Sequence, residues 1–345
     1  MKRVKVQFAR REVEFVDREA AIKQFEKLAE EGTWWPIVVY GPEGCGKSAL
    51  LRQGMEVLKE HGYSVTYVSP LVDKERDRLL YTEDLVEAVK EVLGEIVSRF
   101  PDPFNNARVL IDIAVETLYR IVERGKNRKI AVLADDVFQA IGLDKAELLV
   151  KQFLNMIEYP SVRYDKIVIV VASSEGVTWE RVGRHRWADI VSMWNMSRDG
   201  FRQLYDLLPE PKPPFEEVWR WTGGNPEALE RLYLVDWKVD DVVNAFIRSR
   251  GLVDKAAELS DVEREVLREA LDDPDALFHN IRRAPDLRKK LIEWNLIAFV
   301  YDKSSRFWVD APPPEKDPEL GIGKYYAWQT PLHREAVRRA LETSR

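Results

Sequence analysis

The segment Gly41–Ser48 constrains the fold of this chain more than any other feature of the sequence. It reads Gly-Pro-Glu-Gly-Cys-Gly-Lys-Ser and matches the pattern of Gly, four residues, Gly, Lys and then Ser or Thr. The apolar run Ile37–Tyr40 precedes it, and residues 47–61 follow it with apolar residues at helical spacing. A strand, a glycine-rich turn and a helix in this order form the context in which the pattern binds phosphate. The segment therefore predicts a phosphate-binding loop between a strand and a helix.

Each part of this loop suits one feature of a magnesium nucleoside triphosphate. The glycines let backbone N–H groups wrap the phosphates, and the helix N-terminus adds positive potential. Lys47 is expected to reach the β- and γ-phosphates, and Ser48 is expected to coordinate Mg²⁺. Cys45 stands at a variable position, which we interpret as a spacer rather than a redox switch. The predicted nucleotide contacts are Gly41, Pro42, Glu43, Gly44, Cys45, Gly46, Lys47, Ser48 and Ala49.

A second acidic strand end is required to complete such a site. The apolar run Ile130–Ala134 is followed directly by Asp135 and Asp136. We expect Asp135 to hold Mg²⁺ through water and Asp136 to act as the base that polarises the attacking water. The alternative is an ordinary acidic turn after a buried strand. Together with the loop, the pair predicts a Mg-dependent nucleoside triphosphatase.

Polar residues after the next predicted strand are further candidates for catalysis. A hydroxyl of Ser173 or Ser174 is placed to sense the γ-phosphate, although serines are also common turn formers. One of Arg181, Arg184 and Arg186 is placed to neutralise transition-state charge, and Arg184 is the one we select. Solvated surface arginine is the competing interpretation for each.

The pattern of the first two thirds of the chain is that of an α/β protein. Short, β-branched runs alternate with helical stretches, as in parallel strands joined by crossover helices. The predicted strands are Ile37–Tyr40, Val65–Ser69, Ile130–Ala134, Ile167–Ala172 and Ile190–Met193, and the predicted helices span 47–61, 83–99, 108–124 and 145–157. We predict a P-loop core over residues 1–196, a helical lid over 197–250 and a C-terminal domain over 251–345.

The C-terminal third predicts a winged helix. Short helices precede the runs Leu296–Val300 and Phe307–Val309, which flank a turn-like segment, Asp302–Ser305, and are expected to form a hairpin. Asp310–Gly323 is predicted to be a loop, and Pro331–Leu341 a closing helix.

Composition removes several classes of function. The net charge of -6 gives no global attraction to nucleic acid, and the single cysteine excludes an intramolecular disulfide and a cysteine-based zinc site. No apolar run approaches the length of a membrane helix. The first residues, Met1–Phe8, alternate as a strand does and do not resemble a signal peptide, so we expect a cytoplasmic protein.

The chain resembles the archaeal ATPase family, in the STAND branch of the AAA-like P-loop NTPases. The resemblance rests on Gly41–Ser48, on the aromatic residue and Arg-Glu pair in Phe15–Glu19, on Val132–Val137, and on Thr-Gly-Gly-Asn-Pro-Glu-Ala-Leu at 222–229. In relatives the segment that corresponds to Phe15–Glu19 lies over the adenine, which makes Val16 and Arg18 candidate nucleotide contacts. The segment at 222–229 resembles the lid motif of the class, in which the proline packs near the adenine. Pro226 is therefore a further candidate nucleotide contact. The resemblance implies ATP and ADP as ligands, and therefore a Mg-dependent ATPase.

Two departures from the family pattern bear on turnover. Ala172 stands where relatives often have Gly, and Asp136 replaces the more usual Glu. Shortening the base by one methylene retracts its carboxylate, and a displacement of about 1 Å can cost roughly 10²-fold in rate. We therefore expect slow hydrolysis, which suits a regulatory switch.

A local basic cluster keeps a second function open, that of a DNA-binding, initiator-like or nucleic-acid-remodelling ATPase. The cluster comprises Arg282, Arg283, Arg288, Lys289 and Lys290. The resemblance implies an alternative, in which the winged helix folds back on the nucleotide domain and this face meets acidic protein. A protein partner or a second copy of the chain also stays open. Nearby aromatic residues are interpreted as core rather than as a base-stacking surface. A small-molecule kinase is disfavoured because no second substrate motif is present.

Overall fold

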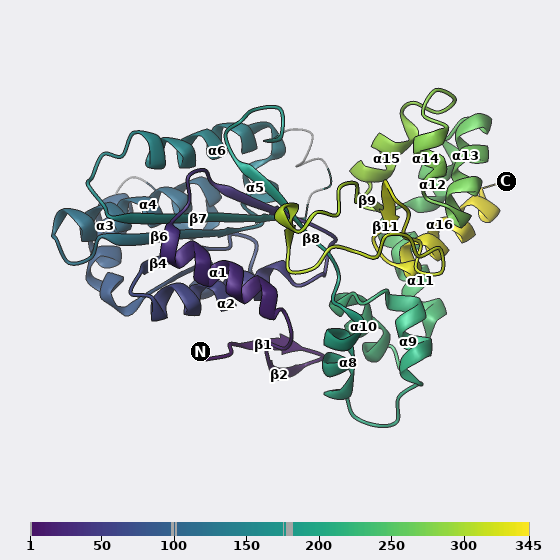
Figure 1. Cartoon of the computed structure of the whole chain (residues 1–345), viewed down its shortest axis with the longest axis horizontal. Coiled ribbons are helices and arrows are strands. Elements are labelled where there is room, and N and C mark those ends of the chain that lie inside the picture. Colours follow the sequence, from purple (N-terminus) through teal and green to yellow (C-terminus); the bar gives the residue numbers. More distant parts are fainter. Residues whose placement is uncertain (1, 98–99, 101, 175, 177–181, 345) are drawn as a thin grey trace. The chain divides into compact units, whose positions relative to one another are not determined.

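The computed structural model describes residues 2–97, 100, 102–174, 176 and 182–344, and the chain folds into two compact units (Figure 1). The first unit comprises Met1–Val4, Glu19–Tyr40 and Lys47–Ser192. The second comprises Lys5–Arg18, Gly41–Gly46 and Met193–Arg345. The turn of the predicted phosphate loop therefore groups with the second unit, whereas the helix that follows it belongs to the first. The predicted boundaries at 196 and 250 stay a prediction.

The first unit is built on a mostly parallel sheet, which confirms the predicted fold class. Its strands run in the order β8-β3-β7-β6-β4-β5. All neighbours are parallel except β5, which runs antiparallel to β4 at the edge and has no counterpart among the predicted strands. The bounds are β3 Ile37–Tyr40, β4 Ser64–Val68, β5 Leu79–Tyr81, β6 Lys129–Asp135, β7 Lys166–Ser173 and β8 Asp189–Met193.

Helices cover both faces of this sheet. The connection from β3 through α2 to β4 moves across the sheet in one direction, whereas those through α4 and α6 move in the other. Because crossovers are right-handed, α2 lies on one face and α4 and α6 lie on the other. The helices are α1 Glu19–Glu31, α2 Lys47–Glu60, α3 Val86–Val97, α4 Ala107–Glu123, α5 Val137–Ile141 and α6 Leu143–Glu158, with 3₁₀ turns at Glu75–Asp77, Glu83–Leu85 and Pro103–Asn105.

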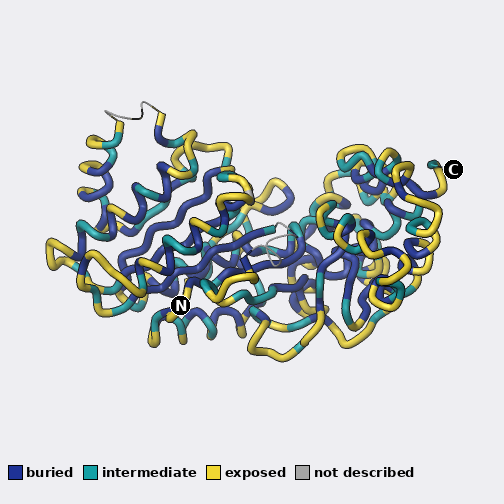
Figure 2. Tube along the Cα trace, turned by 90° about the horizontal axis from the view of Figure 1, so that it is seen from above, coloured by how far each residue is buried: buried dark blue, intermediate teal, exposed yellow. Residues whose placement is uncertain are grey.

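The central strands are buried on both faces, as Figure 2 shows in dark blue. Strand β6 is buried from Ile130 to Asp135, and β7 is buried from Ile167 to Ser173. A strand covered on both sides favours continuous β-branched residues over alternation, which is why these segments were predictable. Among the described residues, no helix combines the length and apolar character needed to cross a bilayer.

The second unit joins the N-terminal hairpin to a group of helices. Strands β1 Lys5–Phe8 and β2 Arg11–Glu14 pair antiparallel. Phe8 packs with Phe201, Phe215 and Leu229 in one apolar cluster. The helices are α8 Arg198–Asp206, α9 Phe215–Thr222, α10 Pro226–Leu234 and α11 Val239–Ser249, so the predicted helical character of 197–250 is confirmed.

One predicted pairing in the C-terminal part is wrong. Strand β9 (Ile297–Phe299) pairs antiparallel with β11 (Tyr326–Trp328), not with the segment at 307–309. Burial decides this outcome, because Trp328 is 1% exposed and its indole N–H donates to Ala270 O. The winged-helix assignment stays a prediction. The remaining elements are α12 Leu252–Ala257, α13 Asp261–Asp272, α14 Ala276–His279, α15 Leu287–Glu293, a 3₁₀ turn at Ser305–Phe307, β10 Trp308–Val309 and α16 Pro331–Thr343, the predicted closing helix.

Candidate functional site

The acidic strand end lies at the carboxyl edge of the sheet in the first unit. Asp135 is the last residue of β6 and is 3% exposed. In the parallel register Tyr67 of β4 pairs with Leu133, two residues before Asp135, so both side chains lie on the same face of the sheet. The Tyr67 hydroxyl donates to Asp135 Oδ2 at 2.7 Å. Asp135 Oδ1 is buried and has no hydrogen-bond partner in the described part of the chain.

The surroundings of Asp135 suit a hard divalent cation. Burial raises the pKa of the Asp135 carboxyl and the Asp136 carboxylate adds to this, whereas hydrogen bonds from Tyr67 and Ser48 and the charge of Lys47 lower it. A buried carboxylate oxygen without a donor, close to a serine hydroxyl, is the kind of donor set that Mg²⁺ takes in nucleotide sites. The residues present therefore fit the metal.

Asp136 occupies the turn between β6 and α5. Its φ of 49° lies in the left-handed region, where Asp and Asn are tolerated better than most residues. Its N–H donates to Ala172 O at 3.1 Å, and Ser174 Oγ donates to Asp136 Oδ1 at 3.4 Å. Asp136 is partly exposed, unlike its neighbour. The second carboxylate is thus held at the surface of the sheet edge, open to water.

The turn of the phosphate loop, Gly41–Gly46 in the second unit, offers its backbone carbonyls to donors from other segments of that unit. Gly44 and Gly46 have φ of 73° and 100°, which glycine adopts without strain. The N–H groups of both glycines have no acceptor within the described ranges. The loop therefore keeps amide donors available for an anion. Its carbonyls accept from Asn225 Nδ2 at Glu43 (2.9 Å), from the Glu227 N–H at Gly44 (3.3 Å) and from Arg18 at Cys45 (3.0 Å).

Glu43 belongs to a closed ring of hydrogen bonds, which we call the amide ring: Glu43, Asn195, Asn225 and Gln329. The Glu43 N–H donates to Gln329 Oε1 (3.1 Å), and Asn195 Nδ2 donates to Gln329 O (2.9 Å). Asn225 Nδ2 closes the ring by donating to Asn195 Oδ1 (2.8 Å) as well as to Glu43 O. All three amide side chains are at least 96% buried. The ring ties the loop to the start of α10 and to the residue that directly follows β11.

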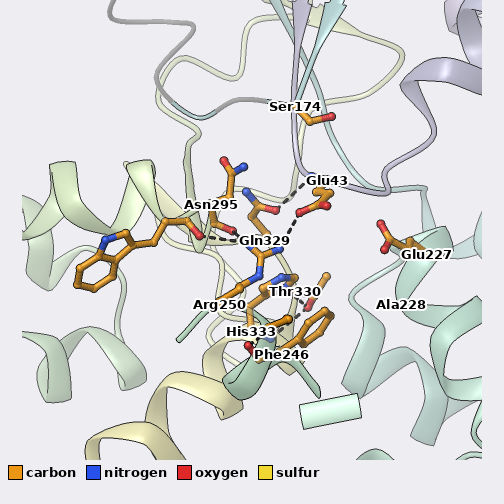
Figure 3. A network of polar contacts seen from close by, with 12 residues as sticks. Glu43, Ser174, Glu227, Ala228, Phe246, Arg250, Asn295, Gln329, Thr330 and His333 are labelled. Carbon is orange, nitrogen blue, oxygen red and sulfur yellow. Dashed lines mark hydrogen bonds and ion pairs between the residues drawn. The ribbon is translucent and has the colours of Figure 1, made fainter. Parts of the chain in front are cut away.

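An arginine reinforces this attachment. Arg250, which follows α11, donates to Glu43 Oε2 at 2.7 Å, and the same guanidinium donates to Trp294 O at 3.0 Å (Figure 3). The Arg250 side chain is 17% exposed and that of Glu43 is 44% exposed. The ion pair therefore lies at the edge of the buried amide ring.

The residues predicted to lie near adenine are all in the second unit. Arg18 is 2% exposed and binds Asp310 (2.9 Å), Cys45 O (3.0 Å) and Trp194 O (2.9 Å). Val16 is partly buried in the apolar cluster of the hairpin, and Pro226 is the first residue of α10. The structure thus gives Arg18 a second role, which is to hold the phosphate loop. Nucleotide contact by these residues stays a prediction.

Comparison with known proteins identifies the family. The family model described as an ATPase domain predominantly from Archaea matches residues 15–232, which is more than half of the chain. This chain is a member of that ATPase family. The match includes the phosphate loop and both aspartates at the end of β6.

Curated relatives of this ATPase match over a shorter stretch. The chromosomal replication initiator protein DnaA 1 of Chlamydia muridarum is 32% identical over 100 residues, which is 28% of this chain and 20% of that protein. DnaA 1 of Chlamydia pneumoniae is 36% identical over 72 residues, 20% of this chain and 14% of that protein. The chain therefore spans about a fifth or less of the length of these relatives.

Solved structures similar to this ATPase share little sequence with it. The Walker-type ATPase of Pyrococcus abyssi has a TM-score of 0.48 at 18% identity and covers 94% of this chain and 96% of its own. The ORC1 protein of Aeropyrum pernix in complex with DNA has a TM-score of 0.37 at 15% identity. The match covers 95% of this chain and 92% of the ORC1 chain. Neither likeness bears on the activity of this chain.

The remaining catalytic candidates of the ATPase lie in the first unit. Ser173 ends β7 and is 1% exposed, and Ser174 is the serine that binds Asp136. Arg184 is exposed and pairs with Glu147. Arg181 lies outside the described residues. The roles of Ser173 and Arg184 in turnover stay predictions.

Most of the predicted basic cluster is paired with neighbouring groups. Arg283 binds Glu265 at 2.8 Å, and Lys290 binds Glu263 at 2.6 Å. Lys289 lies 3.9 Å from Glu293, and Arg288 donates to the Tyr326 hydroxyl at 3.4 Å, whereas Arg282 is exposed. The acidic residues of α13 and α15 therefore offset much of the positive charge of this surface.

Several residues of the site were not predicted. Tyr67, Asn195, Arg250 and Gln329 lie far from the motifs in sequence and carry no pattern of their own. Asn225 is the exception, because an asparagine directly before a proline is typical of a helix N-cap, and it lies in the segment at 222–229 that resembles the lid motif. The other contacts depend on strand register and on the packing of the second unit.

Proposed function

We propose that this ATPase is a switch in which ATP and Mg²⁺ bind the phosphate loop and the acidic strand end, and slow hydrolysis resets the second unit. The observation that carries the proposal is the amide ring, which links Glu43 of the loop to Asn225 at α10 and Gln329 directly after β11. A loop built only to grip phosphate would not require these attachments. Family membership supports the ATPase chemistry.

The ring supplies a physical means of switching. A ligand shifts a conformational equilibrium only through different affinities for the two states. The single N–H of Glu43 donates to Gln329 Oε1, so a phosphate oxygen that takes this donor competes directly with Gln329. Releasing Gln329 leaves a polar group that is 1% exposed without its partner, which costs about 1–3 kcal/mol unless the second unit rearranges. Nucleotide binding is thereby coupled to the ring.

The proposed roles in hydrolysis are supported by the contacts of Asp135 and Asp136 at the end of β6. Ser48 and Asp135 would hold Mg²⁺, which when bound neutralises charge on the β- and γ-phosphates. Lys47 contributes a further positive charge, and Asp136 accepts the proton of the attacking water. Ser174 Oγ orients the Asp136 carboxylate through its hydrogen bond. The short reach of Asp136, compared with a glutamate, is the reason for slow turnover.

Replacing Arg250 with alanine is expected to accelerate the release of ADP about tenfold. The change removes the ion pair to Glu43 and so weakens the attachment of the loop, and couplings of this kind are typically about 1–3 kcal/mol. Stopped-flow fluorescence of a mant-labelled ADP chase measures the release rate. The control is Arg248→Ala, on the exposed side of α11.

The same experiment distinguishes a loop that the second unit controls from a loop that only binds phosphate. If Arg250→Ala releases mant-ADP at the wild-type rate, the second unit does not control the loop through Glu43. An equal acceleration in Arg248→Ala would assign the effect to helix α11 rather than to the ion pair.

A second candidate is an initiator-like ATPase that binds DNA. The similarity to part of the DnaA proteins favours it. Its candidate contacts are the basic cluster of Arg282, Arg283, Arg288, Lys289 and Lys290. It requires DNA affinity that falls with salt and falls again when Arg288, Lys289 and Lys290 are neutralised together. ATP turnover measured alone and with DNA distinguishes the candidates, because the switch predicts no stimulation by DNA.

A further inference from the structure

The buried tyrosine of β4, Tyr67, has no part in the roles proposed for ATP hydrolysis. Tyr67 is 0% exposed, and its ring is enclosed by the sheet and by α2. Its hydroxyl donates to Asp135 Oδ2 at 2.7 Å, and the Arg52 side chain also acts on it. Burying a hydroxyl costs free energy unless it is hydrogen-bonded. A phenylalanine would fill the same space without that requirement, so the hydroxyl calls for an explanation beyond packing.

We propose that Tyr67 is a positioning residue for the divalent cation: its hydroxyl fixes the rotation of the Asp135 carboxylate, so that Oδ1 is presented to the metal. The inference rests on the proposed Mg²⁺ role of Asp135. The two oxygens of this carboxylate differ, since Oδ2 accepts from Tyr67 and Oδ1 is buried with no donor. Within the described part of the chain, Oδ1 is thus the oxygen of Asp135 that has no geometric hydrogen-bond partner and can face a cation beside Ser48.

The surrounding side chains hold the ring in place. The Arg52 guanidinium of α2 lies 5.8 Å from the centre of the Tyr67 ring. Arg52 is four residues after Ser48, so it stands one turn further along the same helix as the serine hydroxyl. The helix that carries Ser48 and the strand that carries Tyr67 thus meet at this ring. A shift of the ring would move the carboxylate relative to Ser48.

Loss of a group that orients a metal-binding carboxylate has a measurable effect on metal affinity. Partners that orient a ligand without touching the metal typically change metal affinity about 10- to 100-fold when removed. Replacing Tyr67 with phenylalanine removes the hydroxyl and keeps the ring. The expected result is that the Mn²⁺ concentration needed for half-maximal binding rises about 10- to 100-fold. Affinity for nucleotide in EDTA is expected to stay within about twofold.

The test uses the full chain and two readouts. Binding of mant-ADP is titrated at rising Mn²⁺ and in EDTA, and the electron paramagnetic resonance signal of free Mn²⁺ reports metal binding directly. The matched control is Tyr63→Phe. Tyr63 is also buried, at 3% exposed, and its hydroxyl donates to the backbone carbonyl of Ala29 at 2.8 Å. This control loses one buried hydrogen bond without touching Asp135.

Two outcomes overturn the inference. One is a Tyr67→Phe chain with the wild-type requirement for Mn²⁺, and the other is an equal change in Tyr63→Phe. The Asp135→Asn variant adds a second test, because adding Tyr67→Phe to it is expected to change Mn²⁺ binding no further. If the wild-type chain binds nucleotide equally with Mn²⁺ and with EDTA, the proposed metal site itself fails, and this result is distinct from a failure of Tyr67 alone.

Discussion

Replacing Asp136 with asparagine is expected to lower ATP turnover by about 10²- to 10⁴-fold, which is the range typical of a lost general base. Asparagine has nearly the same shape and tolerates the left-handed backbone at this position, where φ is 49°. The N–H bond to Ala172 O is kept, so the strand end should stay folded. Single-turnover hydrolysis of radiolabelled ATP measures the rate. Affinity for mant-ATP is expected to change by less than about threefold.

The control for this experiment is Ser174→Ala. Ser174 only orients the carboxylate, through a bond of 3.4 Å, so its loss is expected to slow turnover by about tenfold or less. An Asp136→Asn chain that hydrolyses ATP at the wild-type rate would remove Asp136 as the base. A chain that loses mant-ATP binding together with turnover would instead make Asp136 part of the nucleotide grip.

Replacing Asp310 with asparagine is expected to destabilise the second unit by about 3–5 kcal/mol, the usual cost of breaking a buried ion pair. Arg18 is 2% exposed, and Asp310 is its charged partner at 2.9 Å. The arginine keeps its bonds to Cys45 O and Trp194 O but loses the charged carboxylate with which it forms its ion pair. Thermal unfolding followed by circular dichroism is expected to show a Tm lower by roughly 10 °C.

Asp302→Asn is the matched control for the buried pair. Asp302 also has positive φ, 58° against 67° for Asp310, but it is exposed and its carboxylate accepts only from the Ser304 N–H among the bonds described. Its replacement is expected to change stability by less than about 0.5 kcal/mol. Equal loss of stability in the two variants would show that the turn conformation, and not the Arg18 pair, is responsible.

The elements predicted best were those with a local cause. Strands β3, β6 and β7 carry continuous apolar runs because both faces of the sheet are covered, and α2 and α4 carry an apolar face. The phosphate loop was predictable because its residue types, spacing and neighbouring elements all occur within one short segment. The aspartates were predictable because they follow directly on a buried strand.

Contacts between distant segments were not predictable in the same way. The β9–β11 pairing depends on the burial of Trp328, about 30 residues beyond the strand, and a nearer segment looked like an equally good partner. Asn195 and Gln329 are buried polar residues with satisfied side chains. The Asn195 amide donates to the Gln329 backbone carbonyl and accepts from Asn225, and Gln329 Oε1 accepts from the Glu43 N–H. No property of either residue in the sequence indicates such a partner, since amides are mostly exposed.

Limited proteolysis of residues 196–252, with ATP, with ADP and without nucleotide, tests the proposed switch most directly. This segment contains α8 to α11 and Asn225 of the amide ring. The cleavage pattern within it is expected to differ among the three conditions in the wild-type chain. It is expected to be the same in all three for Lys47→Ala, which lacks the predicted phosphate-binding lysine. An identical pattern in all three conditions for the wild-type chain, at nucleotide concentrations that saturate it, would contradict the switch.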